Sequence, residues 1–368
     1  MLRTAIVLSA AAIVAGGWYA ISLWLSFGSI QKDEFDVDEG RAAISALADT
    51  ERPPPPPVEI IPDVDTIPPA TDPTATTAVP TTTTTQPPEI VGEQLPYDPA
   101  FATSPVVPDE AFDVFLIIGT DAREGRGGSR ADVIIMALLP EDGSPPILVS
   151  IPRDLWLPNA CWGRARRVNV ALNGCGDAAS GPELLAITVA DFTGIQPDHF
   201  ALFDFEDFTR VIDAFGGTEI CVENPVRQNK LNIPAGCTEV DGELALIWMR
   251  SRHTEEFVDG RWRTMRGVND LTRNERQRNL LIQMLGKVKS LDAITSLIGI
   301  VDSISDAVTI DEGITVSGAI GVAWDLRSVV PSEIVKVTIP VRGHRTEGGA
   351  SVLVPATSFA EVFAEYWP

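Results

Sequence analysis

The chain has 368 residues, a formal net charge of −23 and a pI of about 4.4. This length accommodates one large domain with appended segments. Because proteins that bind nucleic acids generally present broad basic surfaces, the acidic balance argues against a nucleic-acid partner.

The N-terminal region contains an uncharged apolar segment, residues 5–27, that is long enough to cross a bilayer. A cleaved signal peptide is the alternative, but its apolar region would be shorter, and Trp18, Tyr19 and Trp24 make a poor cleavage zone. An arginine precedes the segment and mostly acidic residues follow it. The positive-inside rule therefore predicts a single-pass cell-membrane protein with residues 1–4 in the cytoplasm and the remainder outside.

A proline- and threonine-rich stretch follows at residues 52–98, including runs at 53–57 and 81–85. Such a composition cannot build a core and predicts an extended, partly polyproline spacer. At roughly 3.1 Å per residue it reaches on the order of 100 Å from the membrane. We accordingly expect a disordered extracellular linker at 28–111 and a folded domain at 112–368.

Within that domain, short apolar runs alternate with helical periodicity. The runs predict strands at 113–118, 133–139, 147–151, 200–203, 218–222, 334–341 and 351–354. Helices are predicted at 181–193, 208–215, 241–250 and 272–288, across most of 291–328, and at 358–366. Alternation of strands and helices predicts an α/β sandwich around one central sheet.

The four cysteines are Cys161, Cys175, Cys221 and Cys237. An even number in an exported domain suggests two disulfides, for which the sequence allows three connectivities. We favour Cys161–Cys175 and Cys221–Cys237, because each pair closes a short polar loop. Zinc binding is the alternative, although the sequence has no CxxC motif and no histidine near these cysteines.

Two aspartates bracket a glycine-rich loop. Asp121 follows the first predicted strand, residues 125–128 form the loop, and Asp132 precedes the second strand. Ligands of open α/β sheets collect at strand ends, and two carboxylates beside a pyrophosphate are suitable ligands for Mg²⁺. This is not a Walker loop, because the Lys-Ser/Thr pair is missing. The alternative is that aspartate and glycine here merely favour turns.

The third predicted strand leads into Arg153 and Asp154. Arg153 is expected at the same sheet edge as Asp121, and Asp154 is expected to orient an arginine or to cap a turn. Three further arginines either add phosphate contacts or solvate the loop between the first two cysteines; they are Arg164, Arg166 and Arg167.

A second group of basic residues lies farther along the chain. Arg273, Arg276 and Gln277 share one helix face, and Arg250 and Arg252 lie at the end of the preceding predicted helix. Each guanidinium is a planar fork that matches phosphate oxygens, so several together can hold a pyrophosphate. The alternative is a solvated amphipathic helix with its arginines in water.

Other hydrolytic chemistries lack support in the sequence. There is no GxSxG motif and no histidine cluster for zinc, and His199 is expected to be structural. Metal-assisted phosphoryl transfer is the chemistry that remains, with positioning and charge neutralisation supplying most of the catalysis.

From Phe112 onward the chain resembles the LytR–CpsA–Psr family of bacterial envelope phosphotransferases. The matching segments, in the order of the family, are 119–123, 130–132, 150–154, 169–171, 181–184, 204–208, 213–217, 241–245, 250–253, 270–273 and 276–277. The resemblance implies a central mixed β-sheet between layers of helices, preceded here by the membrane segment and linker.

The resemblance also implies an enzyme, a phosphotransferase acting in cell wall assembly. Such proteins transfer a glycan with its phosphate from a polyprenyl-pyrophosphate carrier to peptidoglycan, onto the muramic acid 6-hydroxyl; pyrophosphatase activity is a possible side reaction. The glycans in question include teichoic acid, arabinogalactan and capsule.

Residue roles carry over position by position. Asp121 and Asp132 would hold Mg²⁺, and Asp270 would act as the base, with Arg153 and Arg252 also catalytic. The pyrophosphate would be bound by Arg123, Arg153, Arg250, Arg252, Arg273, Arg276 and Gln277. Arg276→Ala is expected to abolish turnover with little loss of stability, because it would remove a phosphate contact at an exposed face.

Two features complete these expectations. An apolar channel for the lipid tail is expected between sheet and helices, with Ile187, Phe203, Phe208, Ile212 and Ile247 as its lining. The segment 253–269 is longer than the family pattern and carries Arg261, Trp262, Arg263 and Arg266. It is expected to be a lid or an acceptor-binding loop.

Two other functions remain open on the sequence. One is a non-catalytic, membrane-anchored protein that binds a polyprenyl pyrophosphate and has a sensory or regulatory role. The other is a transcription regulator, which the outward topology and the acidic pI disfavour. The presence of both Asp121 and Asp132 favours the enzyme.

Overall fold

The computed structural model describes residues 27–47, 52–53, 95–102, 111–120, 130–251, 253–265, 270–289, 301 and 305–367. The predicted membrane span, apart from Phe27, and most of the proline- and threonine-rich stretch lie outside these residues. No helix in the described ranges combines the length and apolar character needed to cross a bilayer.

A seven-stranded mixed sheet forms the centre of the molecule, in the order β1-β14-β7-β2-β3-β4-β15. Its strands are β1 (Gln31–Asp33), β14 (Thr309–Asp311), β7 (His199–Asp204), β2 (Phe112–Thr120), β3 (Ala131–Pro140), β4 (Ile147–Ser150) and β15 (Val335–Thr338). β2 is parallel to β7 and antiparallel to β3, while β4 is antiparallel to β3 and parallel to β15. The expected central mixed sheet is therefore confirmed.

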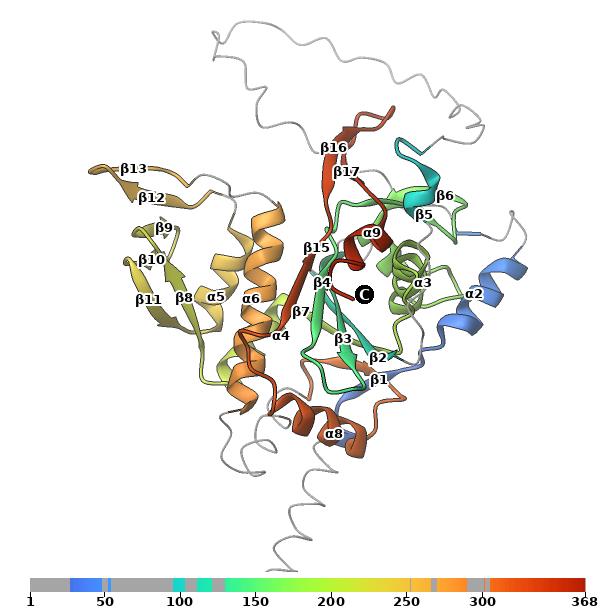
Figure 1. Ribbon diagram of the computed structural model, residues 1–368, viewed down its shortest axis with the longest axis horizontal. Coiled ribbons are helices and arrows are strands. Elements are labelled where there is room, and N and C mark those ends of the chain that lie inside the picture. The colour runs from blue at the N-terminus through green and yellow to red at the C-terminus, as the bar shows by residue number, and fades with distance from the viewer. Residues whose placement is uncertain are drawn as a thin grey trace, which may run out of the picture.

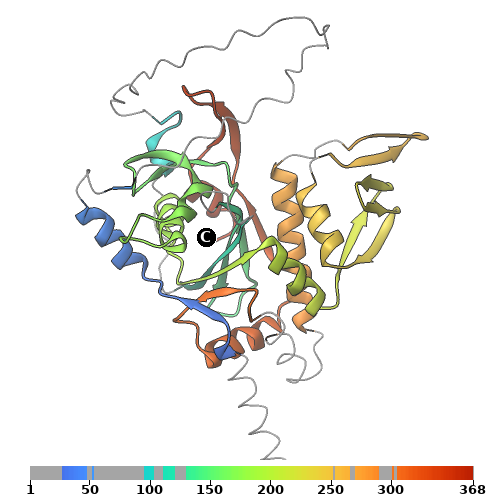
Figure 2. The same ribbon diagram turned by 180° about the vertical axis from the view of Figure 1, so that it is seen from behind.

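Both faces of the sheet are covered, because successive side chains of a strand point to opposite sides. Leu116 and Ile118 of β2 and Met136 of β3 pack toward α3 (Gly181–Thr193). Val133 and Ile135 of β3 pack on the other face toward α6 (Asp270–Lys289). Figures 1 and 2 show the two helices on opposite sides of the sheet. Burial on both faces explains why these strands are almost uninterrupted apolar runs.

α3 follows its sequence signals closely. Ser180 caps the helix by accepting from the Glu183 N–H, and the Glu183 side chain accepts from the Ser180 N–H in return. Gly194 ends the helix at φ 73°, a left-handed conformation that glycine adopts without strain. This helix end is where the sequence predicted it.

A second group of smaller elements, coloured from yellow-green to light orange in Figure 1, packs against α6. It contains α4 (Phe205–Ala214), β8 (Thr218–Val222), β9 (Val226–Gln228), β10 (Leu231–Ile233), β11 (Gly236–Val240), α5 (Gly242–Arg250), β12 (Glu255–Val258) and β13 (Arg261–Thr264). Asp241 caps α5 as expected, accepting from the Leu244 N–H. α6 contributes Leu280 and Met284 to the core of this group and Ile282 to the core beneath the sheet. One helix therefore joins two apolar clusters.

The segment 253–269, expected to be a lid or an acceptor-binding loop, is a β-hairpin in its described part. β12 and β13 pair with each other, and β12 also pairs with β9, so the hairpin extends a four-stranded sheet. None of the three strands was predicted, because each is only three or four residues long and mostly polar.

Part of the predicted linker folds with the domain. β1 pairs with β14 at the edge of the central sheet, and α2 (Val37–Ala46) packs against α3. The backbone N–H of Asp36 donates to Glu183, and the Phe35 ring contacts that of Phe200. Tyr97 is also buried. The folded unit therefore starts before the predicted boundary at residue 112.

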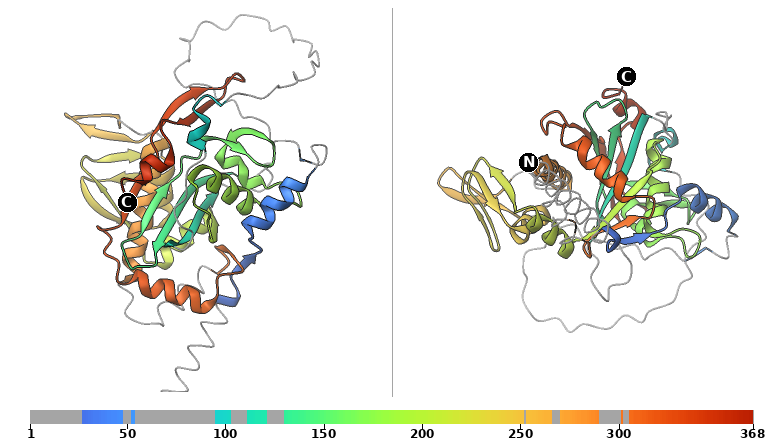
Figure 3. Two further views of the ribbon diagram at one scale, coloured as in Figure 1. Left: turned by 45° about the vertical axis from the view of Figure 1, so that its right-hand side comes forward. Right: turned by 90° about the horizontal axis from the view of Figure 1, so that it is seen from below.

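The remaining elements are short. They are η1 (Pro99–Ala102), β5 (Trp156–Asn159), β6 (Arg164–Arg167), η3 (Val168–Asn173), α8 (Val316–Leu326), β16 (Val341–Arg345), β17 (Ser351–Pro355) and α9 (Phe359–Phe363). The β16–β17 hairpin and α8 lie at opposite ends of the central sheet (Figures 1 and 3). Two expectations are corrected here. The strand expected at 334–341 is divided between β15 and β16, and the region 291–328, expected to be mostly helical, includes strand β14.

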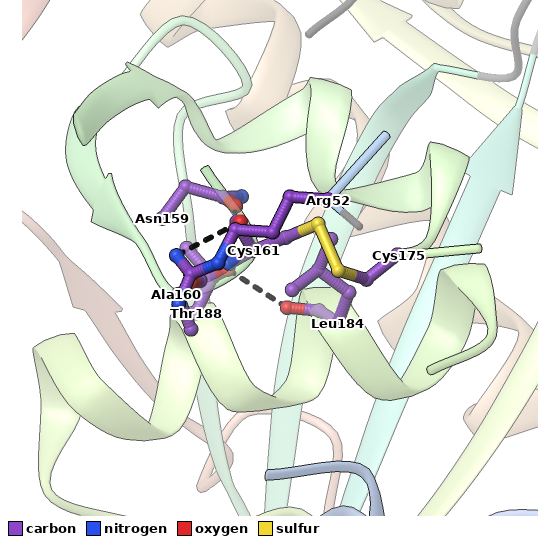
Figure 4. Close-up of a disulfide and its surroundings, with 7 residues drawn as sticks. All are labelled: Arg52, Asn159, Ala160, Cys161, Cys175, Leu184 and Thr188. Carbon is purple, nitrogen blue, oxygen red and sulfur yellow. Dashed lines mark hydrogen bonds between the residues drawn. A yellow bond between two sulfur atoms is a disulfide. The ribbon is translucent and has the colours of Figure 1, made fainter. Parts of the chain in front are cut away.

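Both favoured disulfides are present. Cys161–Cys175, with Cα atoms 5.6 Å apart, is buried in the main core beside Leu184 and Thr188 of α3 (Figure 4). Cys221–Cys237 joins directly opposed residues of β8 and β11 and is exposed. Since each sulfur is bonded to another sulfur, the structure favours the two disulfides over the alternative of a zinc site at these cysteines.

Candidate functional site

Five strands of the central sheet begin or end along the same edge, which runs across the strand ends and not along an outer strand. Thr120 at the end of β2 pairs with Asp204 at the end of β7 and with Ala131 at the start of β3. Ser150 at the end of β4 pairs with Thr338 at the end of β15. Residues that follow β2 and β4, or that begin β3, therefore start from the same edge.

Asp132 and Arg153 meet at this edge. The Arg153 Nη1 atom donates to Asp132 Oδ1 in a close ion pair, and both side chains are about 15% exposed. Asp154 lies 3.3 Å from Arg153 Nε through one oxygen and 3.4 Å from Arg167 Nε through the other. Arg167 in turn donates to the Ser351 carbonyl at 2.8 Å. Asp154 thus orients Arg153, one of its two expected roles.

Two buried side-chain oxygen atoms near Arg153 have no hydrogen-bond partner among the described residues. They are Ser150 Oγ and Asn169 Oδ1, in residues that are 4% and 5% exposed. The Asn169 N–H donates to the Arg153 carbonyl at 3.2 Å, which fixes the two residues side by side. A buried polar atom without a partner is costly, so both atoms are candidates for ligand contact that the predicted site did not include.

Arg276 is not on an exposed face, contrary to expectation. Its guanidinium lies 3.7 Å from the centre of the Trp248 ring and donates to the Trp248 carbonyl at 3.1 Å. It also approaches the Ser251 carbonyl at 3.5 Å and the Met265 sulfur at 3.8 Å. Burial lowers the pKa of Arg276 to about 10. The physical reason for the error is that α5, which packs beside α6, covers this face of the helix.

Arg278 was missed in the sequence and is also buried. It is 5% exposed and donates to the Val337 carbonyl at 3.2 Å and to Thr338 Oγ1 at 3.1 Å, at the end of β15. Two residues on a helix are about 200° apart, so Arg276 faces α5 while Arg278 faces the sheet. This contact brings α6 against the strand that ends beside Ser150.

The other predicted site residues divide into two groups. Arg250 is the half-buried last residue of α5, and Gln277 is buried on α6. The rest lie outside the described residues, either entirely or in their side chains: Asp121, Arg123, Arg252, Asp270 and Arg273. The site described here is therefore the charged edge around Asp132 and Arg153, with α6 and the end of α5 beside it.

The predicted channel lining is partly corrected. Phe203, Phe208, Ile212 and Ile247 belong to one apolar cluster under α4, α5 and α6. Ile187 is fully buried in the cluster between the sheet and α3, on the opposite face. Its helix was predicted correctly, but the sequence did not show which face of the sheet that helix covers.

The fold and this site agree with a family match. The sequence profile of the LytR_cpsA_psr family matches residues 83–366, well over half of the chain. The chain therefore belongs to the LytR_cpsA_psr family, and the resemblance found in the sequence is confirmed.

Relatives in sequence include two proteins of Corynebacterium glutamicum. The chain is 31% identical over 242 residues to the probable cell wall biosynthesis protein LcpB, covering 61% of this chain and 54% of that protein. It is 28% identical over 276 residues to the cell wall biosynthesis protein LcpA, covering 63% and 50%. The chain thus matches about half the length of each.

A third relative is matched over more of its length. The polyisoprenyl-teichoic acid–peptidoglycan teichoic acid transferase TagU of Halalkalibacterium halodurans is 27% identical over 269 residues, covering 70% of this chain and 81% of TagU.

Solved structures share the fold. A LytR-Csp2A-Psr enzyme from Actinomyces oris superposes with a TM-score of 0.55 at 24% identity, over 70% of this chain and 90% of that one. TagV of B. subtilis superposes with a TM-score of 0.56 at 22% identity, over 70% and 96%.

Proposed function

We propose that this protein is a membrane-anchored enzyme that transfers a glycan with its phosphate from a polyprenyl-pyrophosphate carrier to peptidoglycan outside the cell. The observation that carries the proposal is the contact between Asp132 and Arg153, which places a carboxylate and a phosphate-binding guanidinium at one sheet edge. The names of the relatives, a teichoic acid transferase and cell wall biosynthesis proteins, support the same class of reaction.

The residues present fit a bound Mg²⁺. Asp132 supplies the hard oxygen ligands that this ion prefers, and a carboxylate that accepts one bond from Arg153 keeps acceptor capacity for a cation. Asp121, the second proposed ligand, directly follows Thr120 in the chain. When bound, the ion would neutralise charge on the diphosphate.

The other residues of the proposed site either bind phosphate or take up a proton. The proposed pyrophosphate ligands are Arg123, Arg153, Arg250, Arg252, Arg273 and Gln277. The acceptor hydroxyl, taken as the muramic acid 6-hydroxyl, attacks the phosphorus that carries the glycan, and Asp270 takes up its proton. A new P–O bond forms, the P–O bond of the pyrophosphate bridge breaks, and polyprenyl phosphate leaves. Arg153 and Arg252 would stabilise the charge on the leaving group.

The lipid tail is proposed to lie against the apolar cluster that includes Phe203, Phe208, Ile212 and Ile247. This cluster is on the α6 side of the sheet, as are Val133 and Ile135 of β3, the strand that begins beside Asp132. The proposed anchor is residues 5–27, with the N-terminus in the cytoplasm.

The test is phosphate chemistry on a defined lipid. The full chain, purified in detergent, is incubated with geranylgeranyl pyrophosphate and Mg²⁺, and then with a lipid-linked glycan and peptidoglycan. We expect Mg²⁺-dependent cleavage of the diphosphate and, with an acceptor, glycan bound to peptidoglycan. Tight lipid binding without any cleavage or transfer would instead identify a non-catalytic binding protein.

A further inference from the structure

We propose that Arg276 and Trp248 are positioning residues: their stacked pair holds the last turn of α5 in place and thereby aims Arg250 at the phosphate site. This inference rests on the proposed function, because it deepens the role of that site. It also replaces the sequence expectation that Arg276 itself binds phosphate.

The contacts of Arg276 are directed into the protein. Nη1 donates to the Trp248 carbonyl at 3.1 Å and approaches that of Ser251 at 3.5 Å, while Nη2 lies 3.8 Å from Met265 Sδ. The face of the guanidinium covers the Trp248 ring at 3.7 Å. Both terminal nitrogens and the planar face are therefore engaged before any ligand arrives.

The electrostatics suit a helix C-terminus. The last carbonyls of α5 have no partner within the helix and carry the negative end of its dipole, so a cation there is stabilising. Arg276 supplies that cation from a different helix. Its pKa, lowered by burial to about 10, still leaves it charged at neutral pH.

The last turn of α5, which Arg276 contacts, ends at the proposed phosphate ligand Arg250. The chain after it leads into the β12–β13 hairpin. Arg250 is the last residue of α5, and Ser251 directly follows it. The Ser251 hydroxyl contacts Gln228 of β9 and the hydroxyl of Thr254, which are both close contacts, and Ser251 and Thr254 are 3% and 0% exposed. Displacement of Arg276 would therefore release a fully packed polar turn, and a shift of about 1 Å at a phosphate ligand is enough to weaken its action.

Two variants separate positioning from direct phosphate contact. Trp248→Leu removes the stacking partner and cannot itself remove a phosphate ligand, while Arg276→Met removes the guanidinium. We expect each to weaken binding of geranylgeranyl pyrophosphate in the presence of Mg²⁺ by about tenfold, and the double variant to be no weaker than Arg276→Met, since the stacking contact is already lost once the guanidinium is gone. Arg276→Lys, which restores a donor for the carbonyls, should recover part of the loss.

Amide hydrogen exchange of the last turn of α5 tests the positioning contact without any ligand. Faster exchange at the Ser251 amide, which donates to the Trp248 carbonyl, is expected in Arg276→Met and in Trp248→Leu. Lys287→Met is the matched control, because Lys287 donates in the same way to the Phe215 and Gly216 carbonyls after α4. It should leave exchange at Ser251 unchanged.

The outcomes distinguish a positioning role of Arg276 from direct phosphate binding, and they separate failure of this role from failure of the proposed function. If Arg276→Met abolishes lipid binding while Trp248→Leu binds like the wild type, Arg276 is a direct ligand and the inference is wrong. Unchanged exchange at Ser251 in Arg276→Met also overturns it. If the wild-type chain fails to bind the lipid but exchange at Ser251 still accelerates in both variants, the proposed function fails and the positioning contact stands.

Discussion

Asp132 and Arg153 show how much of a site single residues can indicate. The two are 21 positions apart in the chain, and both were selected because each follows or precedes a predicted strand. Their contact requires only that β3 begins where β4 ends, which is a property of neighbouring antiparallel strands. Residue type and position relative to a strand end were therefore sufficient to place each residue near this edge, whereas the ion pair between them was not predicted.

Asp132→Asn tests the carboxylate while preserving its shape. Because a neutral amide is a weaker ligand for Mg²⁺ than a carboxylate and lacks the charge that pairs with Arg153, we expect turnover to fall by about 100-fold or more. The side chain is partly exposed, and Arg153 keeps Asp154, so the unfolding temperature should change little. The measurement is diphosphate cleavage across a Mg²⁺ titration. Wild-type cleavage at every Mg²⁺ concentration would contradict the assignment.

His199 has a structural role, as expected from the sequence. Its Nδ1 atom lies 3.0 Å from Asp311, a carboxylate that is 2% exposed and that also accepts from the Phe200 N–H. Asp113 is 3.8 Å from the other ring nitrogen. The hydrogen bond to Asp311 raises the pKa of His199 above its usual value, with further support from the charges of Asp311, Asp113 and Asp198.

This shift predicts a pH dependence of stability. A raised pKa in the folded state means that the stabilisation is complete below the unfolded pKa, near 6.5, and is lost as pH rises through the folded value. The melting temperature should therefore decline as pH rises from about 6 to about 8. His199→Asn should flatten this decline, and His344→Asn on the β16–β17 hairpin is the matched control. An unchanged slope in His199→Asn would show that another group is responsible.

Among the elements, α6 has the largest effect on the organisation of the site. Its Ile282 packs under the sheet, whereas Leu280 and Met284 pack against the second group of smaller elements. Its arginines are likewise divided, Arg276 toward α5 and Arg278 toward β15. The helix was predicted from periodicity, but a helix buried on two sides has no single exposed face. The expectation that Arg276 lies on an exposed face was wrong for that reason.

The two disulfides differ in their environments and should differ in reactivity. Cys161 and Cys175 are 0% and 1% exposed, while Cys221 and Cys237 lie on the surface of a two-stranded sheet. We expect a mild reductant to open Cys221–Cys237 first, because a thiolate must reach a sulfur atom to exchange with it.

Alkylation followed by mass spectrometry checks the order of reduction. Replacing both Cys221 and Cys237 by serine should leave the chain folded with its unfolding free energy reduced by about 3 kcal/mol, given a loop of this length. Simultaneous labelling of all four cysteines under native conditions would contradict the expected order.

At the scale of the whole molecule, the sheet is completed by segments from both ends of the chain. β1 forms one edge strand, and β15 forms the other. Residues just after the predicted membrane segment therefore belong to the folded domain, and the proline- and threonine-rich stretch lies between two parts of that domain rather than before it. The sequence did not predict this arrangement, because β1 is only three residues long, all of them exposed, and gives no strand pattern.

Truncation tests the role of the N-terminal segment. A chain starting at residue 48 loses β1 and α2, including the buried side chains of Val37 and Ile44, each of which contributes about 1.5–3 kcal/mol. We expect its urea midpoint to fall well below that of a chain starting at residue 27. The double variant Val37→Ala/Ile44→Ala in the longer chain should give part of the same loss. Equal midpoints for the two chains would show that the segment contributes nothing to stability.

The sequence by itself predicted the α/β class, the main strands and helices, the favoured cysteine pairs, and the positions of Asp132 and Arg153 beside strand ends. Each follows from local signals: apolar runs, caps such as Ser180, short loops between cysteines, and polar residues beside strand ends. The tertiary structure decided the placement of Arg276, Arg278 and Ile187, the hairpin at 255–264 and the inclusion of residues 31–46 in the domain. Those features depend on which elements pack against each other, and burial by a distant segment leaves no periodicity in the residues that it covers.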